Sequence, residues 1–217
     1  MSRPPIEALV KIIVSGFEPF GGDKTNSSWE AVKLLPDSLE GAEVVKVQLP
    51  VSFRKVKDLI PLILEEHKPT LLLLTGQASG ISSLHVERVA INVMDARIAD
   101  NDNYKPEDEP IYPGAPAAYF ATIPVKRAVE SIRAAGVPAA VSNSAGTFVC
   151  NAAMYTALHY VESGKMGTLV GFVHVPASPL QALQGNIPSM APGLAARGIE
   201  ACIKACIQYQ RTITGDL

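Results

Sequence analysis

Short apolar runs alternate with amphipathic stretches along most of this chain. An apolar run of strand length that is bounded by turn residues is typical of a strand buried on both faces of a sheet. Runs of this kind predict strands at residues 8–14, 42–49, 70–75, 137–142 and 167–173. We therefore expect a sheet that helices cover on both sides.

The stretches between these strands repeat their apolar residues with the helical period. They predict helices at residues 28–35, 53–67 and 123–136. An alternation of strands and helices implies right-handed βαβ crossovers. The pattern predicts a doubly wound α/β fold, a three-layer α/β/α sandwich around a twisted, mostly parallel sheet, with residues 1–217 forming a single domain.

Residues 84–93, L-H-V-E-R-V-A-I-N-V, alternate instead between two faces. With a period of two, Glu87 shares a predicted strand face with Val89, Ile91 and Val93. A carboxylate on an apolar face is costly to bury unless it has a partner. We expect Glu87 either to open into a cleft or to pair with a cation, such as an imidazolium or an arginine at the sheet edge.

The segments that follow the predicted strands are the places to look for a site, because ligands of open parallel sheets bind outside the carboxyl ends of the strands. These segments are residues 16–22, 76–80, 143–150 and 174–176. The polar, Pro- and Gly-rich stretch at 95–116 is a further candidate, since loops of that length in compact domains are usually functional or disordered.

The composition removes several classes of function. Hydrophobic residues make up 47% and charged residues 18% of the 217 residues, which argues against disorder. With 19 basic and 21 acidic residues, no global field attracts nucleic acid or an anionic membrane. No segment approaches the roughly 20 apolar residues of a membrane helix, and the N-terminus M-S-R-P-P-I-E does not resemble a signal peptide. Three cysteines do not suggest a disulfide framework, so a cytoplasmic location is expected.

Cys150 ends a turn of mostly small residues, N-S-A-G-T-F-V-C, and precedes the helical pattern A-M-Y-T-A-L-H-Y-V. This places it in or near the first turn of a helix, where the exposed N–H groups and the helix dipole lower the pKa of a thiol. Free cysteine is also among the most buried residue types. The local sequence therefore leaves two interpretations of Cys150, a nucleophile or a packing residue.

His174 directly follows the apolar run T-L-V-G-F-V and so lies at the carboxyl end of a predicted strand. A neutral imidazole there can take a thiol proton and later protonate a leaving amine. A hydrogen-bonded structural histidine fits the position equally well. If His174 is the base, an acid that orients the imidazole completes a triad, and Glu87 is the candidate. His67 and His159 lie in helical patterns and are interpreted as structural.

The glycine-rich segment at residues 16–22, G-F-E-P-F-G-G, follows a strand and precedes a helix, as phosphate-binding loops do. It matches neither the dinucleotide-binding nor the P-loop spacing. Phe17 and Phe20 suggest instead an apolar wall for a small, ring-shaped, uncharged ligand, although one of them could equally anchor the core.

Cys202 and Cys206 lie four residues apart in an amphipathic pattern, on one face of a predicted helix. No other residues with metal-ligand spacing accompany them. We therefore expect packing or a subunit contact at this pair, and no metal.

Several blocks that follow one another from about residue 10 to 180 carry a resemblance to a known family. They are S-G-F-E-P-F-G-G-D-K-T-N-S-S-W-E-A-V, G-Q-A-S-G, E-R-V-A-I-N-V-M-D-A-R-I-A-D-N, G-A-P-A-A-Y-F, S-N-S-A-G-T-F-V-C-N and G-F-V-H-V-P. Together they resemble the pyroglutamyl peptidase type I family, the pyrrolidone-carboxylate peptidases. Any one block is weak by itself, but the ordered set is very specific.

The resemblance implies a cytosolic cysteine peptidase that removes an N-terminal pyroglutamyl (5-oxoproline) residue from peptides. It also implies a three-layer α/β sandwich, a homotetramer, and no cofactor or metal. The family's Cys-His-Glu triad matches Cys150, His174 and Glu87, and its oxyanion-side arginine matches Arg97. The family's substrate pocket matches Phe17, Phe20, Asn26, Gln77, Phe148 and Val149.

This sequence departs from the family pattern at a few positions. Ser79 and Ile81 stand where the family usually has a glycine and an arginine, and Val86 replaces a proline. A serine also replaces the proline of the family's N-P-S, and Ala152 stands where a histidine is often found. These departures bear on substrate affinity more than on the type of reaction, since each triad position is kept.

Two other classes of function stay open. One is a non-peptidase small-molecule enzyme on a related α/β fold, such as a nucleoside phosphorylase, which would need a phosphate site. The other is a catalytically silent binding or redox-sensing protein, in which Cys150 is an oxidisable thiol.

Overall fold

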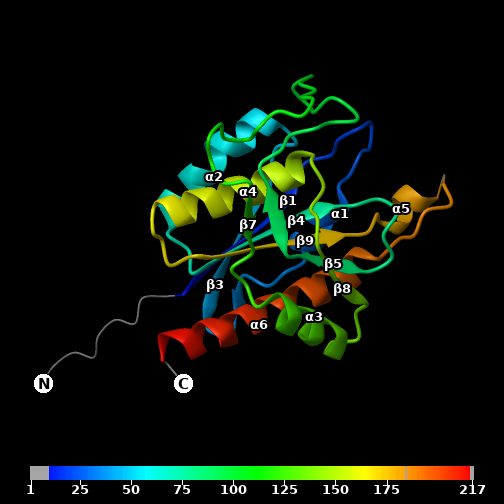
Figure 1. The fold of residues 1–217 in the computed structure, drawn as a ribbon. Coiled ribbons are helices and arrows are strands. Elements are labelled where there is room, and N and C mark those ends of the chain that lie inside the picture. The colour runs from blue at the N-terminus through cyan, green and yellow to red at the C-terminus, as the bar shows by residue number, and fades with distance from the viewer. Residues whose placement is uncertain (1–9, 184, 216–217) are drawn as a thin grey trace, which may run out of the picture.

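A seven-stranded sheet forms the centre of the computed structural model, which describes residues 10–183 and 185–215 (Figure 1). The order of its strands is β2-β3-β1-β4-β9-β5-β8. Their bounds are β1 Lys11–Phe17, β2 Ser38–Leu39, β3 Ala42–Leu49, β4 Leu71–Gln77, β5 Leu84–Glu87, β8 Ala139–Ser142 and β9 Leu169–Val175. A small second sheet pairs β6 (Val89–Ile91) with β7 (Ala118–Phe120).

The central sheet is mostly parallel, as the sequence predicts. Strands β3, β1, β4 and β9 run in one direction. The short strand β2 is antiparallel to β3. At the other edge β5 is antiparallel to β9, and β8 is parallel to β5.

Helices cover both faces of this sheet (Figure 1). One layer consists of α2 (Phe53–His67) and α4 (Val149–Ser163). The opposite layer consists of α1 (Ser27–Val32), α3 (Val125–Ala134) and α6 (Pro192–Thr214). The short helix α5 (Pro179–Ala182) follows the end of β9. The predicted three-layer α/β/α architecture is thereby confirmed.

Successive residues of the central strands point to opposite layers, which explains the continuous apolar runs in the sequence. Ile13 of β1 and Leu72 of β4 are buried in the same hydrophobic cluster as Phe53 of α2. The preceding residue of each strand is buried in the other cluster, with Ile199 of α6. Apolar side chains are therefore required on both faces of the sheet.

Helices α1 and α2 begin at capping residues. Asn26 Oδ1 accepts a hydrogen bond from Ser28 N, and Ser52 Oγ accepts one from Lys55 N. Helix α2 has the predicted bounds, whereas α1 ends at Val32, before the predicted end. Strand β1 continues to Phe17, beyond the predicted strand, whose first residues 8 and 9 lie outside the described part of the chain.

The prediction of one alternating strand over residues 84–93 is wrong. The segment is divided at Arg88, whose N–H donates to Ser142 and whose carbonyl accepts from Ala121 N in a different part of the fold. Glu87 therefore ends a strand of the central sheet, while Val89 starts the small sheet. The expected apolar face does not form, since Val89 is only half-buried whereas Ala90 is fully buried.

Cys202 and Cys206 lie on the inner side of α6, fully buried in the cluster beneath the sheet. The expectation of a packing role is confirmed for both. Within residues 10–183 and 185–215, no group of three or more His, Cys, Asp or Glu side chains could hold a metal ion. No helix in that part of the chain is long and apolar enough to cross a membrane.

Candidate active site

A cavity of about 300 Å³ opens where strands β1, β4 and β9 end. Three of its lining residues belong to these strand ends: Phe17, Gln77 and His174. The cavity brings together every predicted site residue except Glu87. Its lining consists of Phe17, Phe20, Asn26, Val51, Gln77, Asp95, Arg97, Ile98, Ala145, Gly146, Thr147, Phe148, Val149, Cys150 and His174.

Cys150 is the second residue of α4 and is half-buried in the cavity wall. The N-cap, Phe148, supplies no side-chain hydrogen bond to the N–H groups of the first turn. Such groups have no partner within a helix, so they favour negative charge at this end of α4. The thiol packs closely on β4, because a Cβ atom added at Gly76 would lie 2.7 Å from Cys150 Sγ. A glycine on β4 therefore leaves the space that the sulfur occupies.

Cys150 does not reach the cavity in the way that the strand-end rule predicts. Because β8 runs antiparallel to β9, its carboxyl end points away from the edge at which β1, β4 and β9 end. The loop after Ser142 therefore has to turn back to bring Cys150 to the cavity. Thr147 stabilises this return through two bonds to Asp95: its carbonyl accepts from Asp95 N, and its Oγ1 donates to the Asp95 carbonyl. Cys150 lies at the cavity as expected, but the chain reaches it by a different route.

Asn151, next to Cys150, holds the start of α4 against β6. Its Oδ1 accepts from Ile91 N at 2.9 Å, and its Nδ2 donates to the carbonyls of Ile91 and Val93. The side chain is completely buried. The nucleophile candidate is thus fixed to the segment that continues from Glu87.

His174 and Glu87 form a buried hydrogen-bonded pair. His174 Nδ1 lies 2.7 Å from Glu87 Oε1, and their residues are 8% and 1% exposed. The strands that carry them are adjacent, with His85 of β5 opposite His174 of β9. Glu87 therefore has the cationic partner that its burial requires. Its Oε2 has no hydrogen-bond partner among the described residues.

The second ring nitrogen of His174 faces the thiol. Burial lowers the pKa of His174, but its hydrogen bonds with Cys150 and Glu87 outweigh burial and raise the pKa from 6.5 to about 9. Since Nδ1 is bound to Glu87, Nε2 is the nitrogen left for Cys150. A carboxylate, an imidazole and a thiol are thereby connected in a row, the arrangement that activates a cysteine nucleophile.

Aromatic rings form much of the cavity wall. Phe148 packs on Phe20 with ring centroids 6.0 Å apart, and edge-on against Phe53 at 5.3 Å. Phe17 is almost completely buried at the end of β1, so it serves the core as well as the cavity. The core-anchoring interpretation therefore holds for Phe17, and both phenylalanines line the cavity. Val149 is also buried, with only a small surface toward the cavity.

The two amide side chains of the cavity are held by neighbouring groups. Asn26 caps α1 and donates from Nδ2 to the Glu18 carbonyl. Gln77 Oε1 accepts from Ser27 N at 2.9 Å and from Gln181 Nε2 at 3.0 Å. These contacts orient both amides before any ligand enters, which lowers the entropic cost of binding.

The loop that carries Arg97 supplies residues that sequence reasoning missed. Arg97 is exposed at the cavity, together with Asp95 and Ile98 from the same loop. Val51, which follows β3, lines the cavity as well. The long polar loop that contains Asp95 and Ile98 indicated that they could belong to the site. Val51 is the second residue after a predicted strand end, where the strand-end rule places ligand-binding residues.

Comparison with known proteins places the fold and the site in context. Residues 10–209 match the family model for pyroglutamyl peptidase. A pyrrolidone-carboxylate peptidase of Thermococcus kodakarensis is 56% identical over 90% of this chain and 95% of its own length. One from Thermococcus onnurineus is 54% identical over 92% of this chain and 100% of its own length.

Solved structures agree with these sequence matches. The pyrrolidone carboxyl peptidase of Thermococcus litoralis superposes with a TM-score of 0.89 at 38% identity, covering 94% of this chain and 96% of the other. The pyroglutamyl peptidase I of Bacillus amyloliquefaciens superposes with a TM-score of 0.90 at 37% identity, covering 94% and 97%. The chain belongs to the pyroglutamyl peptidase family.

Proposed function

We propose that this chain is a cysteine-type exopeptidase that hydrolyses the bond after an N-terminal pyroglutamyl (5-oxoprolyl) residue of a peptide. Cys150 is the nucleophile, His174 the general acid and base, and Glu87 the residue that orients the imidazole. The observation that supports this most strongly is the buried 2.7 Å contact between His174 and Glu87, beside a thiol at the start of a helix. The names of the relatives supply the pyroglutamyl specificity.

The reaction begins with transfer of the Cys150 proton to His174, whose raised pKa favours the imidazolium. The thiolate attacks the carbonyl carbon of the pyroglutamyl residue and forms a tetrahedral oxyanion. Backbone N–H groups at the start of α4 stabilise this oxyanion together with Arg97, and one such donor contributes about 3 kcal/mol. His174 then protonates the leaving amine, and the peptide bond breaks.

A thioester between Cys150 and the pyroglutamyl group remains. His174, now neutral, takes a proton from a water molecule that attacks the thioester carbonyl. When the second tetrahedral intermediate collapses, pyroglutamate leaves and the proton returns to the Cys150 sulfur or stays on the imidazole. Glu87 keeps Nδ1 of His174 protonated throughout, so that Nε2 carries each proton transfer.

The cavity is suited to a small lactam ring. Its walls are mainly apolar and aromatic, and its volume of about 300 Å³ is at the small end of ligand pockets. A pyroglutamyl ring nitrogen is neutral, so no charged group is needed to recognise it. Hydrogen bonding by oriented amides such as Gln77 can distinguish this ring from a proline ring, which lacks the carbonyl.

Other properties of the chain rest on the family resemblance and its composition. We place the enzyme in the cytoplasm, as a homotetramer that acts on N-terminally pyroglutamylated peptides without a cofactor. We also treat residues 1–217 as one domain, a proposal that the two helical layers around a single sheet support.

The test compares the hydrolysis of a pyroglutamyl-amide reporter with that of the corresponding prolyl-amide. We expect turnover of the first and at least about 10²-fold less of the second, because unpaired polar groups in the cavity penalise the proline ring. Alkylation of the thiol should abolish turnover in the wild type and in a Cys202→Ala control alike. Equal turnover of both reporters, or full activity after alkylation of Cys150, would refute the proposal.

A further inference from the structure

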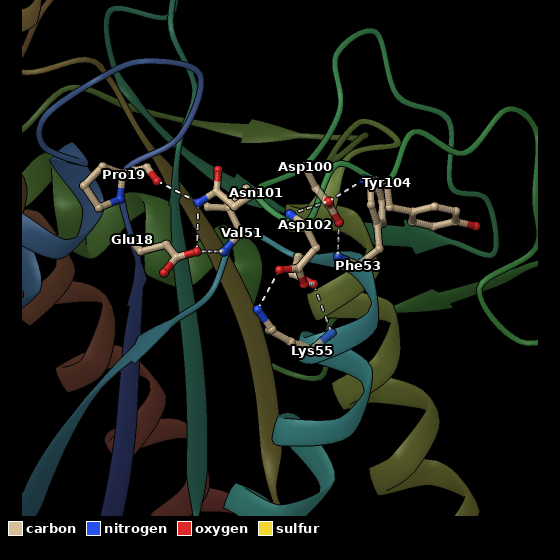
Figure 2. A network of polar contacts seen from close by, with 10 residues as sticks. Glu18, Pro19, Val51, Phe53, Lys55, Asp100, Asn101, Asp102 and Tyr104 are labelled. Carbon is tan, nitrogen blue, oxygen red and sulfur yellow. Dashed lines mark hydrogen bonds and ion pairs between the residues drawn. The ribbon is translucent and has the colours of Figure 1, made fainter.

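A cluster of polar contacts next to the cavity joins three of its walls (Figure 2). On the left of this view is Glu18, which lies between the two cavity residues Phe17 and Phe20 in the sequence. Glu18 Oε1 accepts from Val51 N at 3.0 Å and from Asn101 Nδ2 at 2.8 Å. One carboxylate oxygen therefore binds both the segment after β3 and the loop that carries Arg97.

Asn101 completes the connection from the other side. Its Nδ2 also donates to the Pro19 carbonyl at 2.9 Å, and its backbone N–H donates to the Val51 carbonyl. The backbone of Val51 therefore bonds to both partners. Its N–H donates to Glu18 Oε1 (Figure 2), and its carbonyl accepts from Asn101 N. The segments joined here are more than 30 residues apart in sequence. Backbone bonding of Glu18 to Leu49 also holds the first segment to the end of β3, and the bonds from Asn101 Nδ2 form the direct link between the Glu18 segment and the Arg97 loop.

The loop that Asn101 holds has little regular structure of its own. Between Met94 and Tyr104 no helix or ladder strand is formed, and only Met94 makes an isolated bridge. Asp95 attaches the start of the loop to Thr147, and Asn101 attaches its end to Glu18. The cavity residues Arg97 and Ile98 lie between these two attachments.

A second part of the network holds the loop end to the start of α2. Asp100 Oδ2 accepts from Phe53 N, and its Oδ1 accepts from Asp102 N and Tyr104 N. Lys55 forms an exposed ion pair with Asp102 at 2.6 Å. These contacts keep the turn folded when the Glu18 contact is removed, so a loss of that contact alters the cavity without unfolding the loop.

We propose that Glu18, acting through Asn101 and Val51, is a positioning residue that sets the distance between the Phe17–Phe20 wall and the Arg97–Ile98 wall of the cavity. This inference rests on the proposed function, since the cavity is taken as the binding site of the pyroglutamyl ring. Glu18 acts on the spacing of the walls that bind the ring, while Cys150, His174 and Glu87 are held by other contacts. Its loss therefore raises KM more than it lowers kcat.

The test is steady-state kinetics with a pyroglutamyl-amide reporter on Glu18→Ala, Glu18→Gln and Asn101→Ala. In Glu18→Ala and Asn101→Ala we expect KM to rise about tenfold or more, a change of about 1.4 kcal/mol, with kcat within about threefold of the wild type. Glu18→Gln should stay close to the wild type, because its amide oxygen can accept both hydrogen bonds. The double variant Glu18→Ala/Asn101→Ala should be less impaired than the sum of the two single variants, since both remove the shared Glu18–Asn101 contact.

Glu43→Ala is the matched control. Glu43 also lies at the β1–β3 boundary, at the opposite end of the strands, where it pairs with Lys11 at 3.6 Å. The KM of Glu43→Ala should equal that of the wild type. An equal defect in Glu18→Gln and Glu18→Ala, additive effects in the double variant, or a lower kcat at unchanged KM would overturn the proposal.

Hydrogen exchange separates a failure of this inference from a failure of the proposed function. The backbone amides of residues 97–101 should exchange at least about tenfold faster in Glu18→Ala than in the wild type, whether or not the reporter is hydrolysed. Unchanged exchange there would overturn the positioning role by itself. Faster exchange in a protein whose wild type does not hydrolyse the reporter would refute only the proposed function.

Discussion

Replacing Gly76 by alanine perturbs the nucleophile through one methyl group. The added Cβ would lie 2.7 Å from Cys150 Sγ and 2.8 Å from Phe172 Cζ, whereas ordinary contacts begin at 3.4 Å. Since the backbone of β4 fixes the new atom, the sulfur has to move by at least 0.7 Å, the difference between 3.4 and 2.7 Å. That movement takes the thiol out of line with His174.

The expected cost follows from the geometry of the reaction. A displacement of about 1 Å in a reacting group can cost about 10²-fold in rate. For Gly76→Ala we predict that kcat falls about 10²-fold, with a smaller effect on KM, because the lactam cavity keeps its walls. Alkylation of Cys150 by iodoacetamide should slow as well, since the sulfur leaves the imidazole that activates it.

The assay measures kcat and KM with the pyroglutamyl-amide reporter, the alkylation rate, and thermal unfolding of each variant. Gly167→Ala is the matched control, because a Cβ added there meets no atom within 4 Å. A folded Gly76→Ala enzyme with kcat within about threefold of the wild type would refute the close packing of the sulfur on β4.

Three further predictions concern the residues around the nucleophile. The pKa of His174 is raised from 6.5 to about 9, so the imidazolium and its stabilising contacts are fully present below pH 6.5 and are lost as the pH rises through about 9. We expect kcat/KM to fall along this basic limb of the pH–rate profile, and Glu87→Gln to move the limb to lower pH. A limb at the same pH in both enzymes would contradict this. In the folded protein, iodoacetamide should modify Cys150 alone, because Cys202 and Cys206 are buried. The hydrogen bond with Cys202, together with burial, also raises the pKa of the Cys206 thiol. Peptide mapping before and after unfolding checks this, and rapid labelling of the α6 cysteines in the folded protein would show that the inner face of α6 opens. Asn26→Ala removes the cap of α1 and should lower the free energy of unfolding by about 1 kcal/mol, which urea denaturation measures. An unchanged midpoint of the urea transition would show that the cap does not stabilise the fold.

The elements with strong local patterns could be predicted from the sequence. Helix α2 and strand β3 have the expected bounds, because each carries an uninterrupted period and a clear turn or cap at its ends. The cavity residues after β1 and β4 follow from the rule on the carboxyl ends of strands. Gln77 and Phe20 are found by this rule without any family resemblance.

Features that depend on distant partners could not be predicted in the same way. The break in the strand at Arg88 arises because the backbone of Arg88 forms hydrogen bonds with Ser142 and with Ala121, which are far from it in sequence. The direction of β8 follows from its pairing with β5, which no local pattern shows. The position of the Arg97 loop rests on Glu18 and Asn101, 83 residues apart, and so appears only in three dimensions.

If the Cys150 sulfur forms the bond to the substrate, Cys150→Ser should lose almost all of its kcat/KM for the pyroglutamyl-amide reporter. The serine hydroxyl keeps the size of the side chain but is a much weaker acid than the thiol, so His174 and the helix start cannot activate it as they activate the thiol. We expect a loss on the order of 10⁴-fold at neutral pH in a protein that unfolds at the wild-type temperature. Activity of Cys150→Ser within about tenfold of the wild type would contradict it.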